Sequence, residues 1–174
     1  MYTFNVYILK TYTYWVDVMK LNIEIGDLLY RSKDLVEHAG IYIGNNQVLH
    51  NQPEEGAVIT SFDKFANYRD VKVTSIAGTN HSVLAKRLVD ILGNTNHYNP
   101  LTNNCEHLAS FMIAGRKKSP QVQASLMYSI IAVMVGAHAQ KGHWLLWATG
   151  GALVGLLTHK LTQKYDFIVN PVSA

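Results

Sequence analysis

Residues 37–50 have the sequence EHAGIYIGNNQVLH, and this stretch predicts the β-hairpin around which the fold is arranged. Gly44-Asn45-Asn46 is a turn signal, so the residues on either side are expected to pair as antiparallel strands. His38 and His50 fall on the two arms of this hairpin. A suitable register would bring their rings together on one face of the sheet.

The segments around the hairpin predict an α+β fold. Two helices are indicated by a change to helical period, at residues 83–92 and 105–114, and a glycine follows each of them. Strands followed by helices favour an antiparallel β-sheet packed with helices. A short helical turn is expected at residues 61–65 with Ser61 as its cap. The other strand-like segments are residues 3–19, 28–30, 57–60 and 71–74.

The C-terminal part differs in composition and predicts a hydrophobic helical segment. Two apolar stretches cover residues 124–139 and 144–157, with His138, Lys141 and His143 at the bend between them. Each stretch is shorter than the roughly 20 residues that a transmembrane helix needs. A pair of buried helices or an oligomer interface would also account for them.

Basic residues at both ends of this segment favour a membrane partner. Arg116, Lys117 and Lys118 precede it, and Lys160 and Lys164 follow it, which fits cytoplasmic ends under the positive-inside rule. We therefore expect residues 124–158 to contact a membrane surface or bilayer, with the protein on the cytoplasmic side. The corresponding domain prediction is a catalytic domain at residues 1–119 and a membrane-associating segment at residues 120–174.

Composition excludes several other classes of protein. The net charge is +3 and the basic residues are scattered, so we expect no nucleic-acid partner. A single cysteine excludes an intramolecular disulfide and a zinc site of four cysteines. The first 20 residues lack a basic region followed by an unbroken apolar run, so no secretory signal is predicted.

The single cysteine, Cys105, is a candidate nucleophile because it stands at the predicted start of a helix. Unpaired backbone N–H groups and the helix dipole favour an anion there, which predicts a lowered thiol pKa and a place for an oxyanion. The polar neighbours Asn103, Asn104 and Glu106 predict that the thiol is not deeply buried. A buried structural cysteine is the alternative.

A thiol nucleophile needs a base, and His38 and His50 are the candidates. His38 would take the thiol proton, and His50 would fix its tautomer and orientation. His107 lies two residues after Cys105 on the same helix and points elsewhere, so a structural role is expected. A zinc site from these four residues matches no known ligand spacing. His81 and His97 are expected in loops, and His138, His143 and His159 at bends or interfaces.

The stretches at residues 26–50 (GDLLY…EHAGIYIGNNQVLH) and 103–122 (NNCEHLASFMIAGRKKSPQV) resemble the two motif blocks of the lecithin:retinol acyltransferase-like family. The resemblance covers roughly residues 24–122. It implies a circularly permuted papain-like fold of the NlpC type and a C-terminal hydrophobic anchor. It also implies Cys105 as nucleophile, His38 as general base and His50 as third member, with no metal or organic cofactor.

The resemblance implies a thiol-dependent phospholipid acyltransferase or phospholipase A. Its intermediate would be an acyl-cysteine thioester, and its acyl donor a glycerophospholipid at a membrane. One alternative is a non-enzymatic interaction or membrane-remodelling protein with the same fold. A second alternative, ranked lower, is a cysteine peptidase or amidase. The fold alone does not choose among them, because function belongs to the site.

Overall fold

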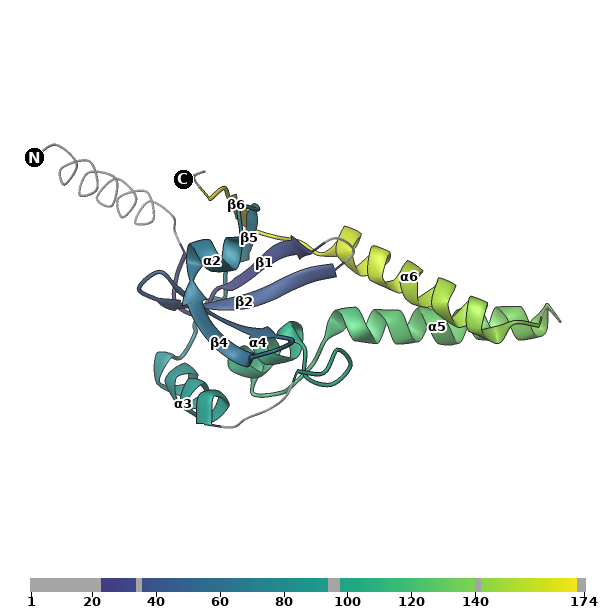
Figure 1. Ribbon diagram of the computed structural model, residues 1–174, viewed down its shortest axis with the longest axis horizontal. Coiled ribbons are helices and arrows are strands. Elements are labelled where there is room, and N and C mark those ends of the chain that lie inside the picture. Colours follow the sequence, from purple (N-terminus) through teal and green to yellow (C-terminus); the bar gives the residue numbers. More distant parts are fainter. Residues whose placement is uncertain (1–22, 34–35, 94–97, 140–141, 172–174) are drawn as a thin grey trace, which may run out of the picture.

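A six-stranded antiparallel sheet forms the centre of the protein, with strand order β4-β3-β2-β1-β5-β6. The computed structural model describes residues 23–33, 36–93, 98–139 and 142–171 (Figure 1). The strand expected at residues 3–19 lies outside the described residues. The strands are β1 (Leu28–Lys33), β2 (Val36–Gly44), β3 (Gln47–Gln52), β4 (Gly56–Ser61), β5 (Val71–Thr74) and β6 (Phe167–Val169).

Five helices of the described residues accompany the sheet, and the two longest project from it. Figure 1 shows α5 and α6 side by side, reaching far beyond the sheet as one long hairpin. This arrangement confirms the α+β prediction with an antiparallel sheet; the circular permutation stays a prediction. The helices are α2 (Phe62–Ala66), α3 (His81–Gly93), α4 (Cys105–Ala114), α5 (Pro120–His138) and α6 (Trp144–Thr162).

The β2–β3 hairpin forms at the predicted turn. Asn45 and Asn46 both adopt left-handed backbone conformations, with φ of 50° and 58°. Asparagine tolerates this region, and consecutive left-handed residues match the twist of the flanking strands. Gly40 pairs with His50 in the resulting register. His38 lies two residues from Gly40, so both histidines are on the same face of the sheet.

Each face of the sheet is covered by its own apolar cluster. On one face, Phe65 of α2 is completely buried among side chains such as Leu29, Val48 and Val71. On the other face, α3 and α4 bury Leu84, Ile91, Leu108 and Met112 against Ile41 and Leu49. Alternate residues of β2 therefore face different helices, which holds the strand in place from both sides.

Two features of the fold were not predicted from the sequence. His81 is the first residue of α3 and not a loop residue, because Asn80 ends the preceding turn and its Oδ1 accepts from the backbone N–H groups of Ser82 and Val83. After α6 the chain returns to the sheet, where β6 pairs with β5. A strand of three residues is too short to give a recognisable alternation. The domain division at residue 119 stays a prediction.

We expect Gly40→Ala to destabilise the protein, because a Cβ at this position would lie 2.7 Å from Val48 Cγ1 and 2.8 Å from Phe65 Cε2. Overpacking of this kind costs about 1–3 kcal/mol of unfolding free energy. Urea denaturation measures the loss. Gly93→Ala is the matched control, since nothing lies within 4 Å of its added Cβ. Equal stability of the two variants would contradict the packing described here.

Candidate active site

Cys105 is the first residue of α4, and local hydrogen bonds define this helix start. Asn104 is the N-cap: its Oδ1 accepts from the backbone N–H of His107 at 3.0 Å. The ring Nδ1 of His107 lies 2.9 Å from the same oxygen. Capping of this type satisfies N–H groups that would otherwise lack partners. The structural role expected of His107 is thus visible in the geometry.

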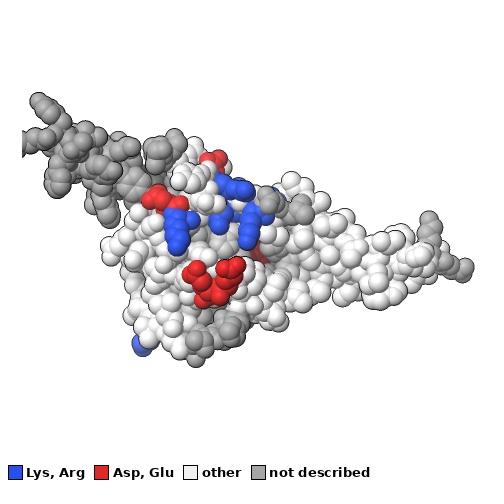
Figure 2. Space-filling model, viewed as in Figure 1, with Lys and Arg blue, Asp and Glu red and all other residues white. Residues whose placement is uncertain are grey.

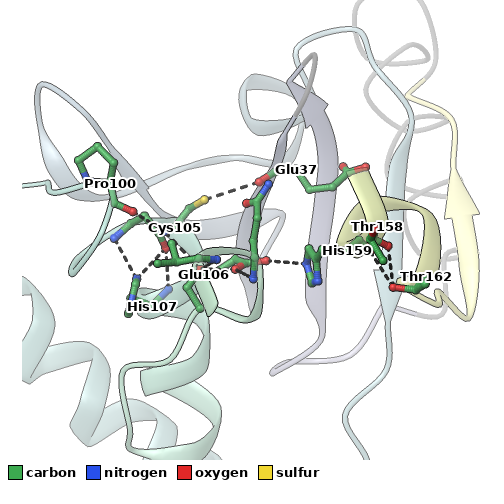
Figure 3. A network of polar contacts seen from close by, with 12 residues as sticks. Glu37, Pro100, Cys105, Glu106, His107, Thr158, His159 and Thr162 are labelled. Carbon is green, nitrogen blue, oxygen red and sulfur yellow. Dashed lines mark hydrogen bonds and ion pairs between the residues drawn. The ribbon is translucent and has the colours of Figure 1, made fainter. Parts of the chain in front are cut away.

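The thiol of Cys105 lies against β2. Its side chain packs with Ala39 and Ala109 and is only 8% exposed. Figure 3 shows Sγ directed toward the backbone carbonyl of Glu37, at 3.8 Å. The expectation of a shallow thiol was therefore wrong, because β2 covers the helix start that the polar neighbours seemed to leave open.

Cys105 and His38 both line a cavity of about 180 Å³. Among the described residues no hydrogen bond joins Sγ to the His38 ring. The two side chains lie on different faces of β2, with Cys105 against Ala39 and His38 against Phe65, and both residues line this cavity. Asn51 also lines it, and its Nδ2 donates to the Asn103 carbonyl oxygen at 2.7 Å, which fixes the chain just before Cys105. The remaining lining residues are Lys33, Val36, Glu37, Pro53 and Tyr98.

His38 and His50 are in direct contact. His38 Nε2 lies 2.9 Å from His50 Nδ1, and the rings are nearly perpendicular at 89°. His50 Nε2 in turn lies 3.0 Å from Thr60 Oγ1 on β4. Phe65 packs under both rings, with centroid distances of 5.6 and 5.3 Å. The three polar side chains form a chain of hydrogen bonds across β2, β3 and β4.

This chain can select the histidine tautomer that a general base needs. If Thr60 Oγ1 accepts from His50 Nε2–H, then His50 Nδ1 carries a lone pair and accepts from His38 Nε2–H. The other ring nitrogen of His38, Nδ1, then has its lone pair available for a proton. Such an arrangement matches the orienting role of the third member in a catalytic triad.

Both histidines are held neutral. Burial lowers the pKa of His38 to about 3, assisted by the charges that His50, Arg31 and Lys33 would place beside it. Burial likewise lowers the pKa of His50 to about 4, with smaller contributions from Arg31 and Lys64. An imidazolium is costly in this pocket because desolvation penalises the charged form.

The thiol is also held neutral. Burial raises the pKa of Cys105 above its usual value, and the negative charge of Glu106 adds to the effect. Hydrogen bonds from backbone N–H groups, that of Ala39 first, act in the opposite direction. The sequence-based prediction of a lowered thiol pKa was therefore wrong: desolvation outweighs the helix terminus. The resting pair is a thiol and a neutral imidazole.

Three side chains that support this site were not predicted. Thr60 and Asn51 have no sequence signal of their own, since their roles depend on strand register. Glu106 is buried and accepts from Ser119 Oγ, from the Gln121 backbone N–H at 3.1 Å and from His159 Nε2 at 3.2 Å. An acidic residue in the first turn of a helix is common, so the sequence did not indicate that Glu106 makes these contacts.

The remaining histidine and metal predictions can be placed as follows. His138 is the last residue of α5 and His143 precedes α6, so both lie at the bend. His159 contacts Glu106 at an interface between helices. His97 lies outside the described residues. Within the described ranges, no group of three or more His, Cys, Asp or Glu side chains has a metal-binding arrangement.

Comparison with known proteins relates the chain to cell-wall hydrolases. Residues 5–84 match the NlpC/P60 family. This similarity to a family of papain-like cysteine peptidases and amidases covers less than half of the chain. The matched range contains His38 and His50 and ends before Cys105.

Similarity to individual curated proteins is local. The chain is 42% identical over 48 residues to the murein DD-endopeptidase MepS/murein LD-carboxypeptidase of Escherichia coli strain K12, covering 27% of this chain and 26% of that protein. The same proteins of strains O6:H1 and O157:H7 match equally. The chain therefore spans about a quarter of the length of these relatives.

These findings correct the functional prediction. The phospholipid acyltransferase or phospholipase A is wrong, because the family match and its relatives point to peptidases and amidases. The peptidase or amidase, which the sequence analysis ranked lower, is the reading they favour. Membership of the lecithin:retinol acyltransferase-like family stays a prediction.

The buried histidines predict a loss of stability in acid. The unfolded chain binds their protons below pH about 6.5, whereas the folded protein binds them only near pH 3–4. The contribution of the neutral histidines to the free energy of unfolding is complete above the unfolded-state pKa of about 6.5, and it is lost as the pH falls toward their folded-state pKa values. We expect His50→Gln to reduce the drop in unfolding free energy between pH 7 and 5 by on the order of 1 kcal/mol. An unchanged drop in urea titrations would contradict neutral, buried histidines.

The raised thiol pKa predicts slow alkylation of Cys105. We measure the rate of Cys105 alkylation by iodoacetamide as a function of pH. We expect the midpoint of this curve to lie at higher pH for the folded protein than for the same chain in denaturant. Because the chain has a single cysteine, the denatured chain is a direct internal reference. A folded-state midpoint at or below the denatured one would instead indicate a preformed thiolate–imidazolium pair.

Proposed function

We propose that this protein is a cysteine hydrolase that cleaves amide bonds in murein-type peptides, with Cys105 as nucleophile, His38 as general base and His50 as orienting residue. The observation that carries the proposal is the cavity shared by Cys105 and His38, together with the His38–His50–Thr60 chain behind it. The NlpC/P60 match supports peptidase or amidase chemistry, and the relatives' names supply the substrate class.

The proposed attack requires a proton transfer from Cys105 to His38 across the cavity that both residues line. His38 Nδ1 accepts the thiol proton as Sγ bonds to the substrate carbonyl carbon, and the carbonyl electrons move to oxygen. Backbone N–H groups at the start of α4 would bind this oxyanion. The imidazolium then gives its proton to the leaving amine. Water, deprotonated by His38, hydrolyses the thioester and restores the thiol.

The electrostatics suit this order of events. A neutral thiol and a neutral imidazole avoid holding two opposite charges in a dry cavity before substrate arrives. Charge separation then occurs only when the substrate carbonyl can share the negative charge. His50 and Thr60 stabilise the imidazolium as it forms, because the hydrogen-bond chain keeps an oriented acceptor beside His38 Nε2–H.

The test is hydrolysis of soluble muropeptides by the purified full chain, followed by mass spectrometry of the released peptides. We expect products from the wild type and none above background from Cys105→Ala or His38→Ala. Lys86→Ala, an exposed position on α3, is the matched control and should leave the rate unchanged. Failure of the folded wild type to cleave a panel of muropeptides would overturn the proposal.

Thr60 acts through His50, so its variant separates orientation from substrate binding. We expect Thr60→Val to lower kcat about 10-fold with little change in KM, because the hydroxyl that orients His50 is lost while the residues that line the cavity are unchanged. Thr60→Ser should recover most of kcat. A loss in KM alone, or no rescue by serine, would contradict the orienting role.

A further inference from the structure

The hairpin of α5 and α6 has small residues inside and large apolar residues outside. The two helices meet through small residues: a Cβ at Gly155 would lie 2.6 Å from the Ala124 carbonyl oxygen and 2.7 Å from Ser125 Cα. Ser129 Oγ donates across the seam to the Ala148 carbonyl oxygen at 3.0 Å. Small residues and a hydroxyl let the backbones approach closely, as between helices in lipid.

Large apolar side chains occupy the outside of the hairpin. The helix α5 is long and apolar enough to cross a membrane, and only 11% of its most apolar 18 residues are buried. Its companion α6 does not meet that criterion on its own but carries the same exposed apolar surface. Examples are Ile130, Met134, Leu146, Leu153 and Val154, which are 48–71% exposed.

The charges of the hairpin are confined to its ends. No Asp, Glu, Lys or Arg occurs between Lys118 and Lys141, or between Lys141 and Lys160. Figure 2 shows the visible face of the hairpin without charged atoms, whereas Lys and Arg gather over the sheet domain. Each helix has 19 residues, or about 28 Å, close to the roughly 30 Å of a bilayer core.

The two ends differ in a way that matches a bilayer. Arg116 to Lys118, together with Lys160 and Lys164, make the base next to the sheet domain positive, which suits anionic lipid headgroups. His138, His143, Trp144 and Trp147 lie at the far end. Aromatic rings and polar side chains favour the membrane–water interface over its core.

The base of the hairpin is fixed to the helix that carries Cys105. Figure 3 shows the side chain of Glu106, the second residue of α4, directed at His159 of α6. The same carboxylate accepts from Ser119 and Gln121 at the start of α5. Both ends of the hairpin are therefore joined to one buried side chain, that of Glu106.

We propose that α5 and α6 cross a lipid bilayer as a helical hairpin, with both of its ends and the sheet domain on the same side. A second copy of this chain is the competing occupant. A second copy would cover only one face of the hairpin. The exposed apolar residues lie on the outer sides of both helices, so an apolar environment around the whole hairpin, such as lipid, is needed to cover them. The inference is independent of the proposed hydrolase activity.

The first test is flotation of the full chain with vesicles of phosphatidylcholine and phosphatidylglycerol. We expect the wild type to float and the double variant Ile130→Lys/Leu153→Lys to bind more than 10-fold less. Val89→Lys, at a 72% exposed apolar position on α3, is the matched control and should float like the wild type. Circular dichroism shows whether each variant is folded. A folded wild type that stays in solution as a dimer would overturn the proposal in favour of the second copy.

The second test asks whether the far end crosses. Gly142→Cys is introduced with Cys105→Ser, and vesicle-bound protein is treated with a membrane-impermeant maleimide. Nothing lies within 4 Å of a Cβ at Gly142, so the change is tolerated sterically. We expect labelling only after detergent, whereas Lys86→Cys in the same background is labelled at once. Labelling of the Gly142→Cys variant without detergent would show that the hairpin lies on the surface and would overturn the crossing.

Discussion

The start of α4 lies against β2 at Ala39, and the position of every group in the candidate site depends on this contact. The small side chains of Ala39 and Ala109 let helix and strand approach closely enough to bury Cys105 between them. The opposite side of β2 carries His38, which packs on Phe65. A strand held by apolar clusters on both faces has little freedom to shift, so the thiol and the imidazole keep their places around one cavity.

Burial gives this site its electrostatic character. A helix terminus by itself favours a thiolate, yet here desolvation raises the Cys105 pKa and lowers that of His38. The low dielectric that makes separated charges costly at rest also strengthens the interactions that stabilise them during a reaction. The hydrogen-bond chain to Thr60 then matters more, because it orients a ring that has no charge to hold it.

Glu106 joins the two halves of the molecule. It follows Cys105 directly in the sequence, yet its carboxylate points away from the cavity to the bases of α5 and α6. Its partners Ser119, Gln121 and His159 satisfy a charge that would be costly if left unpaired. The orientation of the hairpin is thereby tied to the helix that carries the proposed nucleophile.

The sequence by itself determined the local elements and the chemistry that they carry. Gly44-Asn45-Asn46 indicated the turn of the hairpin, Gly115 marked the end of α4, and the order of strands followed by helices indicated an antiparallel sheet. These are short-range effects of backbone conformation and capping. The same motifs suggested lipid acyl transfer, and only comparison with other proteins corrected that to peptidase or amidase chemistry.

Tertiary structure alone decided the burial of Cys105, the partners Thr60 and Asn51, the pairing of β6 and the joint at Glu106. Each joins segments that are distant in the chain, such as Asn51 with Asn103 or Glu106 with His159. Local propensity carries no information about such contacts, because they arise from the packing of whole elements. The raised pKa of the Cys105 thiol has the same origin, because desolvation depends on which groups cover the thiol. The covering strand β2 is more than 60 residues away in the sequence.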